Sequence, residues 1–199
     1  MGASDFSKLP HIGESLRRKE DYRFLTGAGN YTDDIRLDNM THAVFVRSPH
    51  AHANIISVNK AKALAAPGVV AVLDGPDVVD AKINGLPCGW LITDTSGKPM
   101  NEPPHPILAN GKVRYVGDHV AMVVAETLEQ AKNAAELVEV EYDVLPAVVD
   151  VRHAKKATAL HAEAPNNHCY NWAIGDKAAV DAAFAGAAHV TKLDLINNR

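Results

Sequence analysis

The chain has 199 residues, of which 47% are hydrophobic and 22% are charged, and its formal net charge is −4. It can therefore bury a real core, as one large or two small domains, and its interspersed charges offer no basic stripe for nucleic acid or anionic lipid. The sequence also lacks a run long and apolar enough to span a bilayer, and its first residues lack the apolar stretch of a secretory signal. We expect a globular cytoplasmic protein that binds neither nucleic acid nor membrane.

The first thirty or so residues predict an irregular, partly extended arm. Two strands are then expected at Ala43–Arg47 and Ile55–Val58. A short helix at Lys60–Ala65 follows, with Asn59 as its cap and Pro67-Gly68 as its end. The apolar segment Val69–Leu73 predicts another short strand.

The segment Asn84–Pro106 is rich in proline and glycine and shows neither helical nor strand periodicity. It is therefore predicted to form a long loop or a series of turns. Long loops of this kind are often functional, or they pack against a neighbouring part of the protein.

The clearest unit in the sequence is a strand, a helix and a second strand, at Val120–Val124, Leu128–Glu136 and Val138–Val144. Thr127 and Gln130 have the spacing of a capping box at the start of the helix. In the second strand the alternation with period two places Val138, Val140, Tyr142 and Val144 on one face, and Glu139, Glu141 and Asp143 on the other, solvated face.

Beyond Pro146, residues Val148–Pro165 predict a linker of short turns. Asp176 can cap a helix that runs through Phe184 and closes at Gly186, and a last strand is expected at His189–Ile196. The rapid change between strand and helix patterns favours a mixed α/β fold over a helical bundle or a β-sandwich.

Few residues suggest chemistry. The turn Gly27-Ala28-Gly29 lacks the preceding strand, the third glycine and the following helix of a dinucleotide-binding loop, so we interpret it as a plain turn. His50 and His52 would share one face of a strand, as metal ligands do, but no third ligand follows at a suitable spacing. The favoured interpretation is a turn after Pro49 with hydrogen-bonded or solvated rings.

The remaining candidates also have simpler interpretations. Adjacent residues such as His168 and Cys169 rarely face each other as a catalytic pair, so Cys169 is expected to be a buried structural thiol. Ser48 has no recognisable base. The acidic strand residues Glu139, Glu141 and Asp143 match an ordinary solvated face. The sequence therefore predicts no catalytic, cofactor-binding or metal-binding residue in this chain.

The chain contains only two cysteines, Cys88 and Cys169, which lie far apart and form no CxxC pair. They indicate neither a disulfide framework nor a thiolate zinc site. An iron–sulfur cluster normally takes four thiolates, so this chain cannot hold one unaided.

Several segments, in their order along the chain, resemble the large, molybdenum-binding subunit of the xanthine dehydrogenase, aldehyde oxidase and carbon monoxide dehydrogenase family. These are Leu16–Asp34 (LRRKEDYRFLTGAGNYTDD), Phe45–Ile56 (FVRSPHAHANII), Ala66–Leu73 (APGVVAVL), Val113–Glu126 (VRYVGDHVAMVVAE), Ala131–Pro146 (AKNAAELVEVEYDVLP) and Asn171–Lys177 (NWAIGDK). The last of them is similar to the start of the molybdopterin-binding region, with a pattern closest to carbon monoxide dehydrogenase large chains.

The resemblance implies an N-terminal arm at residues 1–19, an α/β hammerhead domain at residues 20–146, and a linker with the start of the molybdopterin-binding domain at residues 147–199. It implies that the complete subunit binds a molybdenum–molybdopterin cofactor through segments absent from this chain and oxidatively hydroxylates a small molecule. Electrons would pass to iron–sulfur and FAD subunits, in a dimer of heterotrimers. This segment alone is expected to bind no cofactor and to be inactive.

Two alternatives remain open. The chain could be a standalone non-catalytic scaffold or binding module with a hammerhead fold. It could also be a small enzyme that uses His50, His52 and the acidic strand face around a divalent metal. The substrate, and whether copper accompanies molybdenum, do not follow from the sequence.

Overall fold

The structure is a computed structural model that describes residues 13–195. The chain divides into two compact units, residues 1–40 and residues 41–199, and each is described by itself. No helix in the described part is long and apolar enough to cross a membrane.

The first unit contains the short helix α1 (Asp21–Leu25) and the single 3₁₀ turn η2 (Thr32–Asp34). Before α1 begins, the backbone N–H and Nε of Arg18 donate to the carboxylate of Asp21, at 3.1 and 3.0 Å. The expectation of an irregular arm is therefore wrong at α1, where this local bonding supports one helical turn. Residues 1–12 lie outside the described part.

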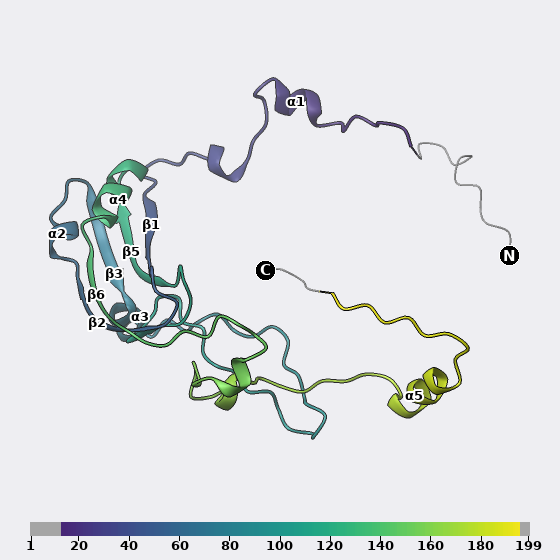
Figure 1. Cartoon of the computed structure of the whole chain (residues 1–199). Helices are drawn as coiled ribbons and strands as arrows, with labels where there is room; N and C mark the ends of the chain where they lie inside the picture. The colour runs from purple at the N-terminus through teal and green to yellow at the C-terminus, as the bar shows by residue number, and fades with distance from the viewer. Residues whose placement is uncertain (1–12, 196–199) are drawn as a thin grey trace. The chain divides into compact units, whose positions relative to one another are not determined.

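The second unit is built on two three-stranded antiparallel sheets (Figure 1). One has the order β1 (His42–Arg47), β5 (His119–Ala125), β3 (Val69–Asp74), and the other β4 (Lys112–Val113), β2 (Ala53–Asn59), β6 (Glu139–Val144). The strands expected from the sequence in this region are confirmed, most with slightly longer bounds, and the mixed α/β class is confirmed as well. The two-residue strand β4 was not predicted.

Helix α4 (Leu128–Ala135) lies against β1 and β5, and the short helix α2 (Ala61–Leu64) packs on β3. The predicted capping box of α4 is confirmed: Thr127 Oγ1 accepts from the Gln130 N–H at 3.2 Å, while Gln130 Oε1 accepts from the Thr127 N–H at 3.0 Å. Asn59 Oδ1 accepts from the Ala61 N–H at 3.1 Å, although Lys60 is the cap residue of α2. Asn59 thus supports the start of α2 from the residue before the cap, whereas the sequence placed it at the cap itself.

Helix α3 (Gly75–Asp80) follows the expected strand Val69–Leu73 and was not predicted from the sequence. In the structure Gly75 and Pro76 begin the helix: Asp74 Oδ1 accepts from the Asp77 N–H at 3.3 Å, and Asp77 Oδ2 accepts from the Asp74 N–H at 2.9 Å. A proline in the first helical turn forgoes no hydrogen bond, because amides there have no partner within the helix. Gly75 is required by close packing, since a Cβ there would lie 2.4 Å from the Ala109 carbonyl oxygen.

The core consists of small apolar side chains in two clusters. One lies between the first sheet and helices α2 and α4; the other lies between β2, β4, β5 and the segment that precedes β4. Strand β5 contributes to both, because Ala121 and Val123 belong to the first cluster and Val120 belongs to the second. This strand therefore joins the two sheets through its opposite faces.

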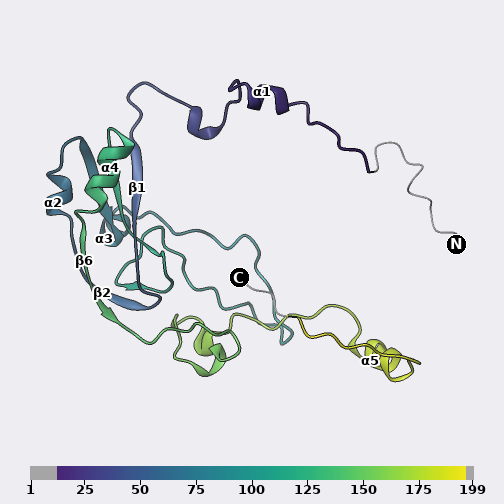
Figure 2. The same cartoon turned by 45° about the horizontal axis from the view of Figure 1, so that its top comes forward.

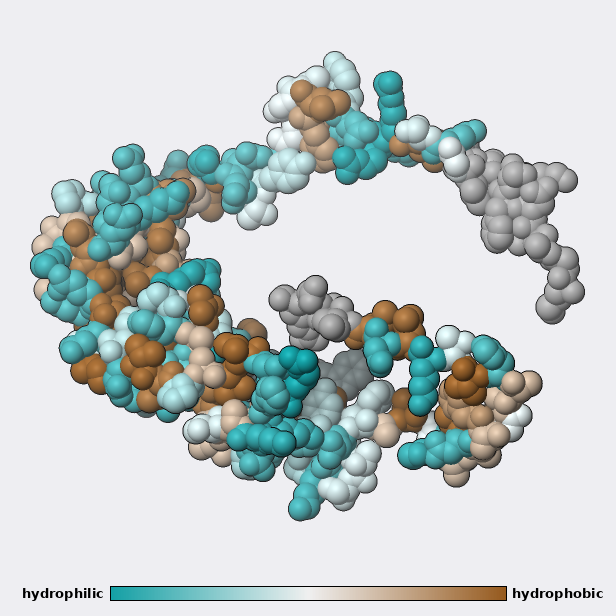
Figure 3. Space-filling model, viewed as in Figure 1, coloured by the Kyte–Doolittle hydropathy of each residue, from teal (hydrophilic) through white to brown (hydrophobic). Residues whose placement is uncertain are grey.

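After β6 the chain continues through two 3₁₀ turns, η3 (Ala154–Lys156) and η4 (Pro165–Asn167), which confirms the predicted linker of turns. Helix α5 (Lys177–Ala185) is also confirmed, with Asp176 Oδ1 accepting from the Ala179 N–H at 3.0 Å and Gly186 at its end. It has no buried residue, and hydrophobic side chains reach the surface along it (Figure 3).

The strand expected at His189–Ile196 is wrong over residues 189–195, which form no regular element, and Ile196 lies outside the described part. The alternation of apolar residues there matches a strand, but a strand is stable only when it is paired in a sheet. Neither sheet of the described chain includes this segment.

Candidate functional site

The glycine-containing turn of the first unit follows a helix and precedes η2, so the interpretation as a plain turn is confirmed. Gly27 has a φ of +72°, which favours glycine, and its N–H donates to the Phe24 carbonyl at the end of α1. The rings of Phe24 and Tyr31 stack with centroids 5.3 Å apart, and a Cβ on Gly29 would clash with Phe24. These glycines shape a helix end.

His50 and His52 lie in the bend between β1 and β2, which confirms the predicted turn. His52 is buried, and its Nδ1 lies 2.8 Å from the Pro146 carbonyl oxygen, so Nδ1 carries the proton and donates. Its Nε2 is buried and has no hydrogen-bond partner among residues 13–195. The ring of His50 packs edge-on against Tyr142, with centroids 5.0 Å apart. Within residues 13–195 no group of three or more His, Cys, Asp or Glu side chains is placed to hold a metal.

Ser48 is a structural residue of the same bend. Its Oγ donates to the His50 carbonyl at 2.9 Å and accepts from the His50 N–H at 3.0 Å. Its backbone bonds to the segment before β5, through Asp118 O at 2.8 Å and the Gly117 N–H at 2.8 Å. Ser48 therefore ties the β1–β2 bend to the start of β5.

The acidic residues of β6 form a solvated face, as expected. Asn59 Nδ2 donates to Glu139 at 3.2 Å, and Asn54 Nδ2 donates to Asp143 at 3.0 Å, both across the pair of strands β2 and β6. A hydrogen bond from Lys62 lowers the pKa of Glu139. On the opposite face Val144 departs from the prediction, because it is exposed at the end of the strand.

Cys169 is exposed, so the expectation of a buried thiol is wrong. The reason is that its stretch of chain is held by backbone groups rather than by side-chain burial. We call residues 168–171 the exit segment, because they lead from the linker toward α5. The Asn101 N–H donates to Cys169 O, the Thr95 N–H donates to Asn171 O, and Asn101 Nδ2 donates to His168 O, each at 2.9 Å.

The predicted loop at Asn84–Pro106 is confirmed, and it folds back on itself. The Leu86 N–H donates to His105 O at 2.8 Å and the Met100 N–H donates to Ile92 O at 2.9 Å, with an isolated bridge between Thr93 and Pro99. The folded-back loop and the exit segment run beside each other in both cartoon views (Figures 1 and 2). The loop is thus the support on which the linker rests.

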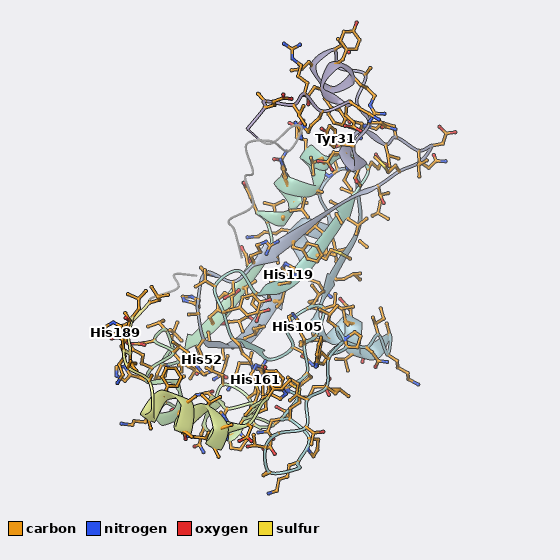
Figure 4. The ribbon with its side chains drawn as sticks, turned by 90° about the vertical axis from the view of Figure 1, so that its right-hand side faces the viewer. Tyr31, His52, His105, His119, His161 and His189 are labelled. Carbon is orange, nitrogen blue, oxygen red and sulfur yellow. The ribbon has the colours of Figure 1, made fainter. Side chains whose placement is uncertain are left out.

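Among the hollows of the described chain, one pocket of about 130 Å³ brings polar side chains together. One wall is the end of the long loop, with Pro103, Pro104, His105 and Pro106. The other walls are His161 of the linker and the β4–β5 connection, through Lys112, Arg114, Tyr115 and Asp118. Figure 4 shows His105 and His161 near each other. The pocket is not predictable from the sequence, because its residues come from three separate segments.

Hydrogen bonds fix the positions of Arg114 and Asp118 in the pocket. Arg114 Nε donates to the Leu160 carbonyl at 2.9 Å, and the backbone N–H of Arg114 donates to Asp118 Oδ2 at 3.0 Å. Burial raises the pKa of Tyr115, and so do the negative charge of Asp118 and their hydrogen bond. Asp118 is therefore already satisfied by its neighbours within this loop.

His161 is partly buried among charges of both signs. Burial lowers the pKa of its imidazole, and the charge of Arg114 lowers that pKa further; Glu163 and Asp118 act in the opposite direction. Its Nδ1 is buried and has no hydrogen-bond partner within the described chain. An unpaired buried polar atom is costly, so this nitrogen is a candidate contact for a ligand.

Comparison with known proteins identifies the family of this chain. The sequence model of the "aldehyde oxidase and xanthine dehydrogenase, a/b hammerhead domain" family matches residues 26–146. The carbon monoxide dehydrogenase large chain of Afipia carboxidovorans is 40% identical, over 93% of this chain and 23% of that relative. The nicotine 6-hydroxylase large subunit of Paenarthrobacter nicotinovorans is 36% identical, over 90% of this chain and 21% of that relative.

Solved structures agree with these relatives. Carbon monoxide dehydrogenase from Oligotropha carboxidovorans superposes with a TM-score of 0.70 and 36% identity, covering 89% of this chain and 22% of that one. Quinoline 2-oxidoreductase from Pseudomonas putida 86 superposes with a TM-score of 0.60 and 44% identity, and the match covers 72% of this chain and 17% of that one. The chain thus resembles part of the large subunit of carbon monoxide dehydrogenase and related molybdenum hydroxylases, and spans less than a quarter of these relatives. It belongs to the aldehyde oxidase and xanthine dehydrogenase family, and residues 26–146 match that family's α/β hammerhead domain.

Proposed function

We propose that this chain is the N-terminal portion of a molybdenum hydroxylase large subunit similar to the carbon monoxide dehydrogenase large chain. The observation that carries the proposal is the coverage: the similarity extends over 93% of this chain but only 23% of the relative from Afipia carboxidovorans. The domain boundaries at residues 19 and 146 and a cytoplasmic location are part of the same proposal.

The role of this segment is structural. Backbone hydrogen bonds from Thr95 and Asn101 hold the exit segment, and the chain then continues into α5, which buries none of its apolar residues. An amphipathic or apolar helix gains most of its stability by packing on a partner. We infer that the hammerhead domain positions the linker, and that α5 packs against a part of the subunit outside this chain.

The described residues do not fit a molybdenum–molybdopterin cofactor. The pocket at His161, at about 130 Å³, is well below the roughly 300–1,000 Å³ of small-molecule sites. The wider groove between Phe184 and Asp194 is lined by exposed residues of one segment. In this proposal the cofactor is held by the remainder of the large subunit, and residues 1–199 alone are inactive.

The complete enzyme would be an oxidoreductase that hydroxylates a small molecule. Its electrons would leave through iron–sulfur and FAD subunits in a dimer of heterotrimers. The two cysteines of this chain are both free and exposed, fewer than the four thiolates that an iron–sulfur cluster normally takes, so in this proposal the cluster is held outside residues 1–199.

Metal analysis tests the proposal. The complete gene product and a product limited to residues 1–199 are purified from the same host, and their molybdenum content is measured. We expect molybdenum close to one atom per complete chain and none in residues 1–199. Stoichiometric molybdenum in the short product, or none in a complete chain that is several times longer, contradicts the proposal. A complete product of only 199 residues instead favours the standalone scaffold.

A further inference from the structure

The pocket at His161 has no part in the structural role proposed above. We infer that it binds one small oxyanion, a carboxylate or phosphate group, between Arg114, Lys112 and His161.

The cations in the pocket outnumber the free anions. Lys112 and Arg114 both line it, and neither forms an ion pair within the described chain. The single lining carboxylate, Asp118, accepts the Arg114 backbone N–H and interacts with Tyr115. The lining therefore carries two cations against one carboxylate, an excess of positive charge that an anion would complement. Glu163, whose charge also acts on His161, is not part of the lining.

The hydrogen-bond donors of Arg114 are held in place by a bond to the linker. The bond from Arg114 Nε to Leu160 O fixes the guanidinium, and its terminal amino groups have no hydrogen-bond partner among residues 13–195. A guanidinium held in this way offers parallel donors that match a carboxylate or phosphate. On the opposite wall, the prolines at 103, 104 and 106 have no N–H to offer, so His105 is the only source of donors there.

His161 supplies the unsatisfied contact. Its buried Nδ1 lacks a partner within the described part, and burial, followed by the positive charge of Arg114, lowers the pKa of the imidazole. A bound anion would offset that charge and would accept a hydrogen bond from the imidazole. The pocket volume of about 130 Å³ is close to the roughly 150 Å³ of a cavity that admits benzene, which is enough for a phosphate or a carboxyl group.

The test uses the complete polypeptide and inorganic phosphate as the probe. Isothermal titration calorimetry at low ionic strength measures binding to the natural protein and to Arg114→Gln, Lys112→Gln and Lys155→Gln. Lys155 is an exposed cation of the linker outside the pocket, so its variant is the charge-matched control. The Lys112 variant removes a charge only, because the Lys112 side chain forms no hydrogen bond within the described residues.

We expect saturable binding at one site, weakened about tenfold or more by Arg114→Gln, since a charge-assisted hydrogen bond contributes at least that factor. Lys112→Gln weakens it several-fold, and Lys155→Gln leaves it unchanged. Phosphate binding that is equal in the natural protein and in both pocket variants overturns the inference.

If the natural protein binds no phosphate, a crystal structure of the complete chain decides the source of the anion. An Asp or Glu carboxylate from beyond Arg199 seated between Arg114 and His161 supports the inference, with the chain supplying its own oxyanion. A neutral side chain or solvent alone in that position overturns it.

Discussion

The side-chain amide of Asn101 donates a hydrogen bond of 2.9 Å to the backbone carbonyl of His168, which lies 67 residues further along the chain. The backbone N–H of Asn101 donates to the next carbonyl, at Cys169. One residue of the long loop therefore fixes two consecutive residues of the exit segment, and Asn101 is the natural place to test whether the loop holds the linker.

We expect Asn101→Ala to loosen the exit segment. The substitution removes the side-chain bond but keeps the backbone bond, and a hydrogen bond contributes about 0.5–1.5 kcal/mol. Local opening should therefore become roughly two- to tenfold more frequent, and limited proteolysis within residues 84–106 or 168–171 should accelerate by a similar factor. The measurement is the rate at which the intact chain disappears, with the cleavage sites identified by mass.

Asn84→Ala is the matched control, because Asn84 is an exposed residue at the start of the same loop and its side chain forms no hydrogen bond within residues 13–195. Its cleavage rate should equal that of the natural chain. Equal rates for all three proteins would show that the bond to His168 does not restrain this region.

The capping box at the start of α4 should contribute measurably to stability. Thr127→Ala removes the oxygen that accepts the Gln130 N–H, and loss of an N-terminal cap costs about 1 kcal/mol in the free energy of unfolding. Thr127→Ser keeps the hydroxyl and should recover most of that loss. Urea unfolding followed by circular dichroism distinguishes the two, and equal losses in both variants would assign the effect to the missing methyl group.

The ion pairs of Lys60 predict a defined dependence of stability on pH. Its Nζ lies 3.2 Å from Asp74 and 2.5 Å from Asp77, which connects the start of α2 to the cap of α3. The hydrogen bond from Lys60 lowers the pKa of Asp77. Burial alone would lower the pKa of Lys60, but hydrogen bonds and charge attraction from the two aspartates outweigh it and raise that pKa.

The directions of these two pKa shifts determine how stability changes with pH. Asp77 stabilises the fold above its ordinary pKa of 3.8, and that contribution is lost as the pH falls through the lower pKa of the folded state. The contribution of Lys60 is complete below its ordinary pKa of 10.5 and is lost as the pH rises through the higher folded pKa. The difference in unfolding free energy between the natural chain and Lys60→Met should therefore be largest between these limits and shrink outside them.

Lys62→Met is the control, since Lys62 forms an exposed ion pair with Glu139. Exposed pairs contribute between about 0 and 1 kcal/mol, so this variant should change little at any pH. A difference for Lys60→Met that stays constant from acid to alkaline pH would mean that packing of its aliphatic stem, and not charge, accounts for its effect.

The histidines of the β1–β2 bend should affect stability rather than metal content. His52 donates to Pro146 and is buried, so His52→Ala removes a buried hydrogen bond and leaves a cavity, at a cost of about 2 kcal/mol or more. After dialysis, residues 1–199 should retain no stoichiometric divalent metal, with or without this substitution. Stoichiometric metal that is lost in His52→Ala would revive the small metal-dependent enzyme.

The fold was predictable wherever local signals are strong. The alternation in β6 and the Thr127–Gln130 spacing gave a strand and a helix start that the structure confirms, because both depend on residues close in sequence. Helix α3 was missed because Gly75-Pro76 is typical both of a turn and of a first helical turn. Only the reciprocal bonds of Asp74 and Asp77 distinguish the two.

Tertiary contacts account for the errors. The strand expected at His189–Ile196 has an apolar alternation but no paired neighbour within the described part. Cys169 is exposed although hydrogen bonds from the loop hold the backbone of the exit segment. The pocket at His161 could not be predicted either, since Arg114, His105 and His161 are brought together only by the folding of three segments. The family was recognisable from several similar segments in the same order along the chain, whereas the pocket at His161 was not.

The most direct test of the central claim is the intact mass of the polypeptide that carries this sequence, purified from its native source. The proposal that the chain is one part of a molybdenum hydroxylase large subunit requires a mass several times 21.3 kDa, with molybdenum in the same fraction. A single species close to 21.3 kDa without molybdenum would contradict it, and the standalone scaffold would then be the better account.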